Sequence, residues 1–426
     1  MTRVYKFGGA SVKDAAGVRN LERIVRLALN DRQSKEQSQM PDGLMVVVSA
    51  MGKTTNALER VVEFLSVNKE EQALAQWVDI IDHHVAIMKE LGLQPGVDIR
   101  WQGEIPYDPT KSFDENYDQV VSMGEILSTQ IIAVYLLKQG LSVEWWNMPK
   151  LLRTDDTWRE AKVDDEASRA IIRSGWNRAQ RPDIVIAQGF IGGTVDGRRT
   201  TLGREGSDYT AALLGNYLDA DSVTIWKDVP GILNADPRIE PNTVLIPSLR
   251  YQDAVELSYS GAQVIHPKTI KPLENKRIPL FVKPFGDPEA AGSRISEDGV
   301  GPIDIPVYIW RKNQILITMR AKDFGFVLEE SLSEIFDIIN RHRLKVSLIQ
   351  SSAVTISVSV DNTRFVPAAI EELQKHFTVS YNDNLSLLTI RGTTPEILEQ
   401  AKTGRTIMLS QTTRRTARLV VAEKNN

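Results

Sequence analysis

The segment TLGREGSDYT, residues 201–210, combines two glycines with charges of both signs. The glycines would let the backbone turn tightly, as it does in phosphate-binding loops. A loop that bound only polyphosphate would have little use for the carboxylates of Glu205 and Asp208. Arg204 can bind a carboxylate through two parallel hydrogen bonds, and Asp208 could orient a lysine or a metal-bound phosphate. The combination predicts a site for a small zwitterion, such as an amino acid, beside the phosphates of a nucleotide.

Two further motifs follow predicted strands. KFGGASV (6–12) would bring backbone N–H groups and a helix N-terminus to an anion, and Lys6 could add a positive charge. The alternative is a tight turn with a surface lysine, and the spacing is not that of a P-loop. VSAMGKTTN (48–56) carries small and hydroxylated residues, which stand where open α/β sheets bind ligands. Its alternative is a polar loop that caps the next helix.

Charged residues in two other segments could either bind a ligand or face solvent. SMGEILS (122–128) sets Glu125 in a helix of small and apolar residues, where the carboxylate either faces solvent or binds a cation such as an ammonium group. IWKDVPGILNADPR (225–238) carries Lys227, Asp228 and Arg238 beyond the end of a strand. These three charges belong either to a ligand site or to two ordinary turns.

The remaining candidates for chemistry are weak. His83 and His84 lack a partner at metal-binding spacing, so no protein metal site is predicted. His266 precedes a proline and is expected to be structural. Trp145 and Trp146 are expected to pack in the core.

The elements that must position these residues follow an α/β pattern. Short apolar runs predict strands at 3–7, 44–49, 141–146, 183–190, 222–226 and 278–283. Several are continuous β-branched runs, which suit strands buried on both faces of a mainly parallel sheet. A helix capped near Asp14 is predicted between the first two strands. Residues 66–120 lack strand signals and are predicted to be mostly helical.

The pattern changes after a segment rich in Pro, Gly and acidic residues at 284–306. Strands are predicted at 313–320, 344–350 and 354–360, with a helix around 332–339 and another around 366–377. The segment 378–390 is predicted to be a hairpin with its turn at Asn382–Asn384. Strand–helix–strand–strand–helix–strand is the ferredoxin-like order. The order begins again in reduced form after residue 378, which predicts up to two small α+β modules.

Bulk composition excludes several classes of protein. The chain has 426 residues, enough for two or three domains, and a formal net charge of −4 argues against a general nucleic-acid binder. It has no cysteines, which excludes disulfides and thiol catalysis. We find no signal peptide and no apolar run of membrane-spanning length. A soluble, cytoplasmic protein that binds neither nucleic acid nor membrane is predicted.

Taken together, these segments resemble the aspartokinase branch of the amino-acid kinase family over nearly the whole chain. The most specific matches are KFGGASV, VSAMGKTTN, GE at 124–125, LLRTDD (151–156), QGFIG, TLGREGSDYTAA, KDVPGILNADPR and ELSYSGAQVIHPKT (256–269). The resemblance implies an amino-acid-kinase-like layered α/β domain, followed by ferredoxin-like modules of the ACT type. We place the catalytic domain at 1–290, a linker at 291–310, and tandem or interleaved ACT-like modules at 311–426, the second shortened.

The resemblance also implies a reaction. The γ-phosphoryl group of ATP would move to the side-chain carboxylate of L-aspartate, giving 4-phospho-L-aspartate, in the first step toward lysine, threonine, methionine and isoleucine. Mg²⁺ would be carried on the phosphates of ATP. Aspartate is already ionised at neutral pH, so no protein base is required. Two alternatives stay open: a non-catalytic amino-acid sensor or regulatory subunit on the same fold, and a kinase for another small acid, such as glutamate or an acylated glutamate.

Residue roles are implied position by position. Lys6 would neutralise charge on the transferred phosphoryl group, and Asp208 would hold Lys6 in place. Glu125 would take the ammonium group of the substrate and Arg204 a carboxylate. The full substrate-binding set would be Thr55, Glu125, Arg204 and Ser207. The nucleotide would be held by Gly8, Gly9, Ser11, Lys227, Asp228, Arg238 and Gln263.

Four positions depart from the usual family pattern. Ala10 replaces threonine, Glu205 replaces a glycine, Lys227 stands where threonine is common, and Gln263 replaces a lysine that contacts nucleotide phosphate. A lysine gained at 227 could offset the one lost at 263. We expect the Glu205 carboxylate to turn outward or to pair with a neighbouring cation, because it would otherwise repel phosphate.

Regulation by lysine of the usual type is not expected. Lysine-sensitive relatives hold the effector partly through carboxylates, and the chain has Ser347 and Ala353 where we align those positions. The tail could instead serve mainly to build a dimer. ACT modules usually pair side by side, so a homodimer is predicted.

Overall fold

The computed structural model describes residues 2–33, 43–99, 104–178, 180–260, 265–300, 305–322 and 329–422. The chain forms two compact units, which are described separately. The first comprises Met1–Ile232, Leu245–Val255 and Val264–Val300, and the second comprises Leu233–Val244, Glu256–Gln263 and Gly301–Asn426. The second unit therefore includes two short segments that precede the end of the first.

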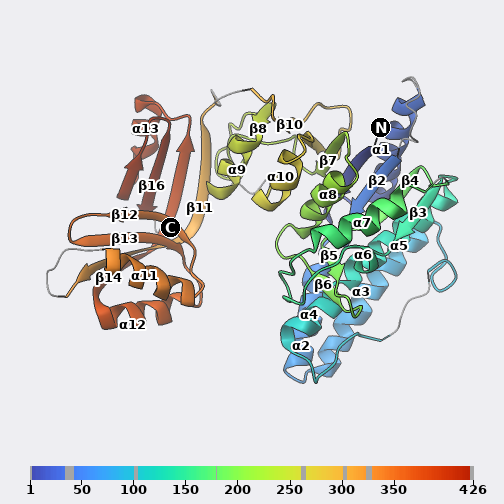
Figure 1. Cartoon of the computed structure of the whole chain (residues 1–426), viewed down its shortest axis with the longest axis horizontal. Coiled ribbons are helices and arrows are strands. Elements are labelled where there is room, and N and C mark those ends of the chain that lie inside the picture. The colour runs from blue at the N-terminus through green and yellow to red at the C-terminus, as the bar shows by residue number, and fades with distance from the viewer. Residues whose placement is uncertain are drawn as a thin grey trace. The chain divides into compact units, whose positions relative to one another are not determined.

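An eight-stranded sheet forms the centre of the first unit, in the order β3-β4-β2-β1-β7-β9-β10-β8 (Figure 1). The strands are β1 (Thr2–Phe7), β2 (Gly43–Val48), β3 (Val143–Trp146), β4 (Ile184–Gln188), β7 (Ser222–Lys227), β8 (Ser248–Arg250), β9 (Leu280–Pro284) and β10 (Ser293–Ser296). Neighbours run parallel except β9 and β10. All six predicted strands are confirmed within two residues. β10 lies inside the range predicted as a linker, so sheet structure continues into that range.

Helices cover both faces of this sheet. The helices of the first unit are α1 (Ala15–Gln33), α2 (Thr54–Ser66), α3 (Glu70–Glu90), α4 (Phe113–Val121), α5 (Met123–Lys138), α6 (Met148–Leu151), α7 (Asp165–Trp176), α8 (Gly206–Tyr217) and α10 (Pro267–Glu274). Trp226 of β7 lies in a core with residues of α1 and α5. On the opposite face of β7, a Cβ on Gly215 of α8 would come within 2.5 Å of Val223. Gly215 therefore lets α8 lie directly against the sheet.

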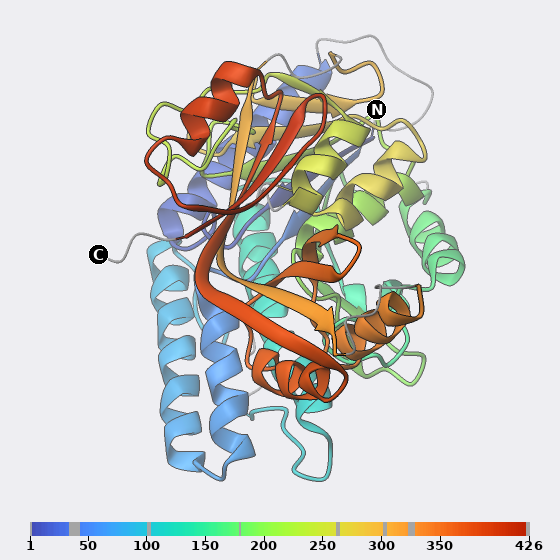
Figure 2. The same ribbon diagram turned by 90° about the vertical axis from the view of Figure 1, so that its left-hand side faces the viewer.

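The predicted helical region beside the sheet is confirmed. α2 and α3 lie side by side (Figures 1 and 2) and enclose a core with α4 that includes Leu58, Trp77 and Val120. The segment Phe113–Lys138, which holds α4 and α5, has the length and composition of a membrane-spanning helix, but 72% of its most apolar window is buried inside the structure. The core helix of a water-soluble protein has the same properties. The Asp14 cap is also confirmed, because its Oδ1 accepts a hydrogen bond from Gly17 N at 2.8 Å.

The second unit is built on a six-stranded sheet in the order β12-β13-β11-β14-β16-β15. Its elements are β11 (Val307–Ala321), α11 (Glu329–Arg341), β12 (Val346–Ser351), β13 (Thr355–Asp361), α12 (Val366–His376), β14 (Phe377–Arg391), α13 (Pro395–Lys402), β15 (Ile407–Thr412) and β16 (Thr416–Ala422), and α9 (Tyr251–Ser260) contributes to both units. The run from β11 to β14 has the predicted ferredoxin-like order. All its strand pairs are antiparallel.

The predicted hairpin at 378–390 is wrong, because these residues form one continuous strand, β14. The turn signal at Asn382–Asn384 marks an irregularity in this strand, where the register with β11 shifts. Asn384 has φ 52°, and Asn313 beside the shift in β11 has φ 54°. Asparagine tolerates this left-handed conformation better than most residues, so a bulge uses the same residue type as a turn.

Both long strands serve two modules. The first part of β11, Val307–Arg311, pairs with the end of β14, and Gln314–Ala321 pairs with the beginning of β14 and with β13. α11 and α12 pack over one core and α13 over another. Figure 2 shows the long, bent course of β14. The modules are interleaved through β11 and β14, and α13 is the one described helix of the second module.

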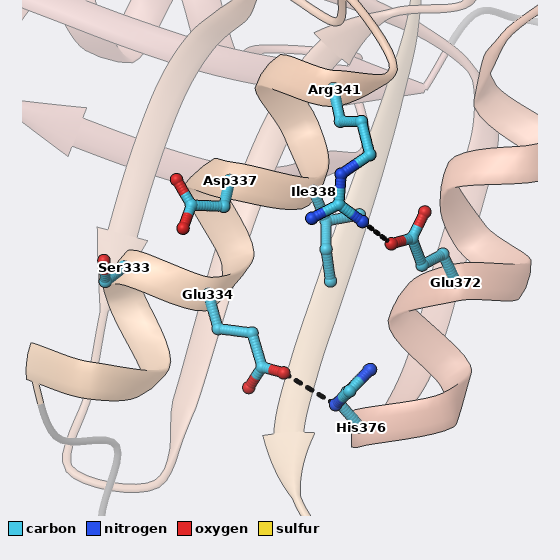
Figure 3. A pocket seen from close by; sticks show the side chains of 7 residues that line it. All are labelled: Ser333, Glu334, Asp337, Ile338, Arg341, Glu372 and His376. Carbon is cyan, nitrogen blue, oxygen red and sulfur yellow. Dashed lines mark hydrogen bonds and ion pairs between the residues drawn. The ribbon is translucent and has the colours of Figure 1, made fainter.

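An open pocket of about 540 Å³ lies between α11 and α12 in the second unit. Its lining residues are Ser333, Glu334, Asp337, Ile338, Arg341, Glu372 and His376 (Figure 3). Glu334 contacts His376, and Glu372 contacts Arg341 (Figure 3). These pairs join the two helices across the pocket.

Candidate active site

The buried carboxylate of Asp208 joins two lysines at one edge of the sheet. Lys6 near the end of β1 lies 2.7 Å from Oδ1 of Asp208, and Lys227 at the end of β7 lies 3.4 Å from Oδ2. Asp208 is 2% exposed. Burial alone would raise the pKa of Asp208, but the two ammonium groups outweigh it and hold the pKa below its usual value. The carboxylate is therefore ionised and fixes both lysines in place.

The turn after β1 lies against the turn after β2. A Cβ on Gly9 would come within 2.6 Å of Ala50 O, so no other residue fits there without a shift. Gly52 N donates to Gly9 O at 3.0 Å, and Ser11 N donates to Gly8 O at 3.0 Å. Two motifs that are forty residues apart thus form one compact backbone surface beside Lys6.

Glu125 is buried near the same turns. It stands in the first turn of α5, is 2% exposed, and its Oε1 accepts a hydrogen bond from Ala50 N at 3.2 Å. Its Oε2 has no hydrogen-bond donor among the described residues. Burial raises the pKa of Glu125 to about 8, against the lowering effects of the Ala50 N–H and the charge of Lys6. A carboxylate with one unpaired oxygen beside a glycine turn fits the ammonium group of a ligand.

The loop before α8 holds the remaining charges. Arg204 is exposed, whereas Ser207 is buried in the first turn of α8. A Cβ on Gly189 would come within 2.6 Å of Ser207 Oγ, so the glycine after β4 lets this hydroxyl approach the sheet. The loop therefore lies at the same edge as β1, β2, β4 and β7, where parallel strands place their carboxyl ends.

Glu205 is partly buried instead of turning outward, contrary to one of the two expected arrangements. It has φ 54° at the N-cap of α8, and its Oε2 is buried. Burial raises the pKa of Glu205, and the charges of Lys227 and Lys6 oppose this rise, that of Lys227 more strongly. The carboxylate is thus partly buried and within the electrostatic influence of both lysines. The two charges that depart from the family pattern in this region, at 205 and 227, therefore stabilise each other.

The other predicted residues lie in three different situations. Thr55 is half-buried in the first turn of α2, and Asp228 is exposed just after Lys227. Arg238 belongs to the second unit, where it hydrogen-bonds Asp236, so its place at a nucleotide remains a prediction. Gln263 lies outside the described residues.

His266 and the two neighbouring tryptophans have the structural roles expected of them. Nδ1 of His266 accepts a hydrogen bond from Lys268 N at 3.2 Å and caps α10. Trp146 is 5% exposed in the core, and Trp145 is partly buried. No group of three or more metal-ligating side chains occurs in the described ranges, which include His83 and His84.

One residue at the site was missed by sequence reasoning. Phe190 follows Gly189 with φ 69°, and its N–H donates to Thr210 Oγ1 of α8 at 3.1 Å. A Cβ on Gly206 would come within 2.7 Å of its ring. Positive φ is rare for an aromatic residue, but nothing in the motif QGFIG distinguishes Phe190 from a core residue.

Comparison with known proteins decides the family. The model of the Amino acid kinase family matches residues 1–284. Lysine-sensitive aspartokinase 3 of Escherichia coli (strain K12) is 32% identical over 410 residues, which cover 91% of this chain and 86% of that protein. The chain belongs to the aspartokinase family.

Other aspartokinases agree with this assignment. The Aspartokinase of Chlamydia trachomatis is 29% identical and covers 91% of this chain and 86% of its own length. The crystal structure of E. coli aspartokinase III in complex with aspartate and ADP, in the R-state, superposes with a TM-score of 0.81 at 27% identity, covering 99% of this chain and 96% of that one. The T-state complex with lysine and aspartate gives a TM-score of 0.71. The predicted aspartokinase fold, with its mostly parallel sheet and its antiparallel C-terminal sheet, is confirmed.

Proposed function

We propose that the protein is an aspartate kinase, which transfers the γ-phosphoryl group of ATP to the side-chain carboxylate of L-aspartate. The observation that carries this proposal is the buried Lys6–Asp208 pair, set between a glycine turn and the half-satisfied carboxylate of Glu125. The homologous E. coli enzyme was crystallised with aspartate and ADP. Family membership favours this function over a non-catalytic sensor and over a kinase for another acid.

The substrate would be held at both ends. Oε2 of Glu125 accepts the ammonium group, which supplies the missing donor and compensates the buried charge. Arg204 takes the α-carboxylate, and its exposed side chain is accessible to an incoming ligand. Thr55 and Ser207 offer hydroxyl groups beside these two contacts. The reacting side-chain carboxylate then faces the phosphoryl group without any need for a base.

Phosphoryl transfer requires positioning and charge neutralisation more than covalent chemistry. Lys6 is held by Asp208 with its ammonium group 3.5 Å from the position of a Cβ on Gly8, so it is fixed against the turn that would line the phosphates. Lys227 adds a second positive charge beside it, because its ammonium group is paired with the same Asp208 carboxylate. Gly8, Gly9, Ser11, Asp228, Arg238 and Gln263 complete the proposed nucleotide-binding set.

Mg²⁺ is proposed as a companion of ATP and not as a resident of the protein. The described residues contain no cluster of three metal-ligating side chains. In kinase sites, Mg²⁺ commonly binds substrate phosphates and water. When bound, the ion would neutralise phosphate charge. The lysines fit this arrangement because they can neutralise the phosphate oxygens that the ion leaves uncovered.

The role of Lys6 is tested by Lys6→Ala. Loss of a fixed cation at the transferring group typically costs a factor of about 10² to 10³ in kcat, so ADP release should fall at least that far. Lys13→Ala, an exposed lysine on the loop between β1 and α1, is the matched control and should retain full activity. Circular dichroism checks that both variants are folded. A folded Lys6→Ala enzyme with near-normal kcat would refute the assigned role.

A homodimer through the ACT-like modules and a cytoplasmic location are also proposed. The second unit, with its interleaved modules, supports the first of these proposals. Sedimentation equilibrium would contradict the dimer if the mass stayed at that of one chain at micromolar concentration. Fractionation of the source cells would contradict the location if the protein were found outside the cytoplasm.

A further inference from the structure

Four polar side chains along α4 and its C-cap residue hydrogen-bond the short strand β6 (Arg199–Thr201) and the residue before it. This strand leads into the substrate loop. The four side chains are Glu115, Asp118, Gln119 and Ser122, spaced i, i+3, i+4 and i+7, so they share one side of the helix. Oε1 of Glu115 accepts from Arg198 Nη1 at 3.2 Å, and Gln119 exchanges hydrogen bonds with both backbone groups of Arg199. Oγ of Ser122 accepts from Arg199 Nε at 2.7 Å. We call this set the α4 seam.

Asp118 is the most buried and most connected charge in the seam. It is 0% exposed. Its carboxylate accepts from Thr201 N at 2.9 Å, from Thr201 Oγ1 at 2.7 Å, and from Arg159 N at 3.1 Å. Burial raises the pKa of Asp118 to about 6, and the hydrogen bonds from Thr201 and Arg159 oppose this rise. The group is thus largely ionised at pH 7, and its hydrogen bonds are of the strong, charge-assisted kind.

The position of Asp118 along the chain links the two ends of the proposed substrate site. Toward the C-terminus, α4 passes through Ser122 into α5, which carries Glu125. Across the seam, Thr201 lies three residues before Arg204. The second partner, Arg159, lies on the other side of the same loop, because a Cβ on Gly203 would come within 3.2 Å of Arg159 O. One carboxylate therefore ties the loop with Arg204 to the helix pair with Glu125.

We infer that Asp118 is a positioning residue for the amino-acid substrate, which fixes the separation of Glu125 and Arg204 and thereby sets the affinity and chain-length selectivity for aspartate. This inference rests on the proposed function. Asp118 does not touch the substrate in this scheme, since it is fully enclosed by Thr201 and the backbone of Arg159. Asp118 acts by fixing the positions of the residues that bind the substrate. A misplacement of the substrate by about 1 Å can lower the reaction rate by a factor of about 10².

The test is Asp118→Asn, which keeps the shape of the side chain but replaces one acceptor oxygen by a donor. KM for L-aspartate should rise roughly 10-fold to 100-fold, whereas kcat and KM for ATP should change less than about 3-fold. The preference for aspartate over glutamate should decrease. Thr201→Val removes the hydroxyl partner and should reproduce the effect, and the double variant should be no worse than Asp118→Asn alone.

Asp114→Asn is the matched control, because it lies on the same helix and contacts Arg159 only through an exposed side-chain pair. It should leave KM for aspartate unchanged. Unchanged KM for aspartate in both Asp118→Asn and Thr201→Val would overturn the inference. So would a parallel loss of kcat, KM for ATP and melting temperature, which is the result of general destabilisation. Calorimetric titration with L-aspartate compares the same variants by binding, without turnover. A wild-type protein that binds aspartate but shows no turnover would therefore refute the proposed function and leave the inference about Asp118 testable by binding.

Discussion

Burial of the Glu125 carboxyl group disfavours its ionised form. The group has one hydrogen bond, from Ala50 N, and a pKa raised by burial to about 8. In the empty enzyme at pH 7 it is therefore mostly protonated. An ammonium ligand favours the ionised form, so binding of aspartate releases a proton.

The raised pKa of Glu125 predicts a pH dependence. Between pH 6.5 and about 8, kcat/KM for aspartate should rise with pH and then level off, because the empty site loses its proton in this range. Glu125→Gln should abolish the rise and lower kcat/KM by about 10² or more. Steady-state rates across this range test both statements. A flat wild-type profile, or a profile unchanged by Glu125→Gln, would contradict them.

Glu125→Gln should also stabilise the empty protein. The folded pKa of about 8 exceeds the unfolded value of 4.5, so the folded state holds more protons between these pH values and loses stability as pH rises. A glutamine has no such charge, and the gain in unfolding free energy at pH 7 should be on the order of 3 kcal/mol. Urea denaturation at pH 5 and pH 8 tests this, since the gain should be larger at pH 8.

Glu205 makes a second residue-scale prediction. Its carboxylate lies near Lys227 and Lys6, the charges proposed to meet phosphate. Glu205→Gly should therefore lower KM for ATP by roughly 2-fold to 10-fold. It should also raise the melting temperature, because glycine adopts φ 54° without a steric cost. Glu205→Gln is the control that removes only the charge. An unchanged KM for ATP in both variants would show that the carboxylate does not act on phosphate.

At the scale of single residues, the sequence predicted which side chains form the site better than it predicted how they are oriented. Lys6, Asp208 and Glu125 carried recognisable motifs, and the structure brings them together. The direction of the Glu205 side chain depends on the left-handed backbone before α8, which a sequence does not display. The role proposed for Asp118 depends on a seam between α4 and β6, whose partners lie about eighty residues apart.

Two positions in the C-terminal strands bear on the expected response to lysine. Ser347 in β12 accepts a hydrogen bond from Arg311 Nη1 at 2.6 Å, and Ala353 is exposed between β12 and β13. A guanidinium thus stands where we align a carboxylate of the lysine-sensitive relatives. An ammonium-bearing effector would meet a like charge instead of an opposite one.

Millimolar L-lysine should therefore leave the rate unchanged. The measurement is initial velocity against lysine concentration at an aspartate concentration near KM, with a lysine-sensitive relative assayed in parallel. Inhibition of this enzyme by lysine at concentrations that inhibit the relative would contradict the prediction.

At the scale of elements, the sequence predicted six strands of the first sheet because each is a compact apolar run. The prediction failed where one strand serves two modules. β14 carries the turn signal Asn382–Asn384 in its middle, and only its pairing with β11 shows that the strand continues through a register shift without reversing direction. The short strands β5 (Ile191–Gly193), β6, β8 and β10 were also missed, because three or four residues give no detectable period.

At the scale of the whole molecule, the order of motifs was more informative than any single motif. Lys6, Ala50, Glu125, Asp208 and Lys227 are distant in sequence, but the carboxyl ends of parallel strands share one edge of a sheet. A predicted parallel sheet therefore already implied that these segments meet. The domain boundaries at 290 and 310 remain predictions, and the second unit recruits residues 233–244 and 256–263 from earlier in the chain.

The most direct measurement is aspartate-dependent acyl phosphate formation, with MgATP and hydroxylamine as the trap, across L-aspartate, L-glutamate and N-acetyl-L-glutamate. The aspartate kinase assignment predicts hydroxamate with L-aspartate and little with the two longer acids, at a rate that Lys6→Ala abolishes. Measurable binding of L-aspartate without hydroxamate from any of the three acids would contradict the assignment and favour a non-catalytic sensor.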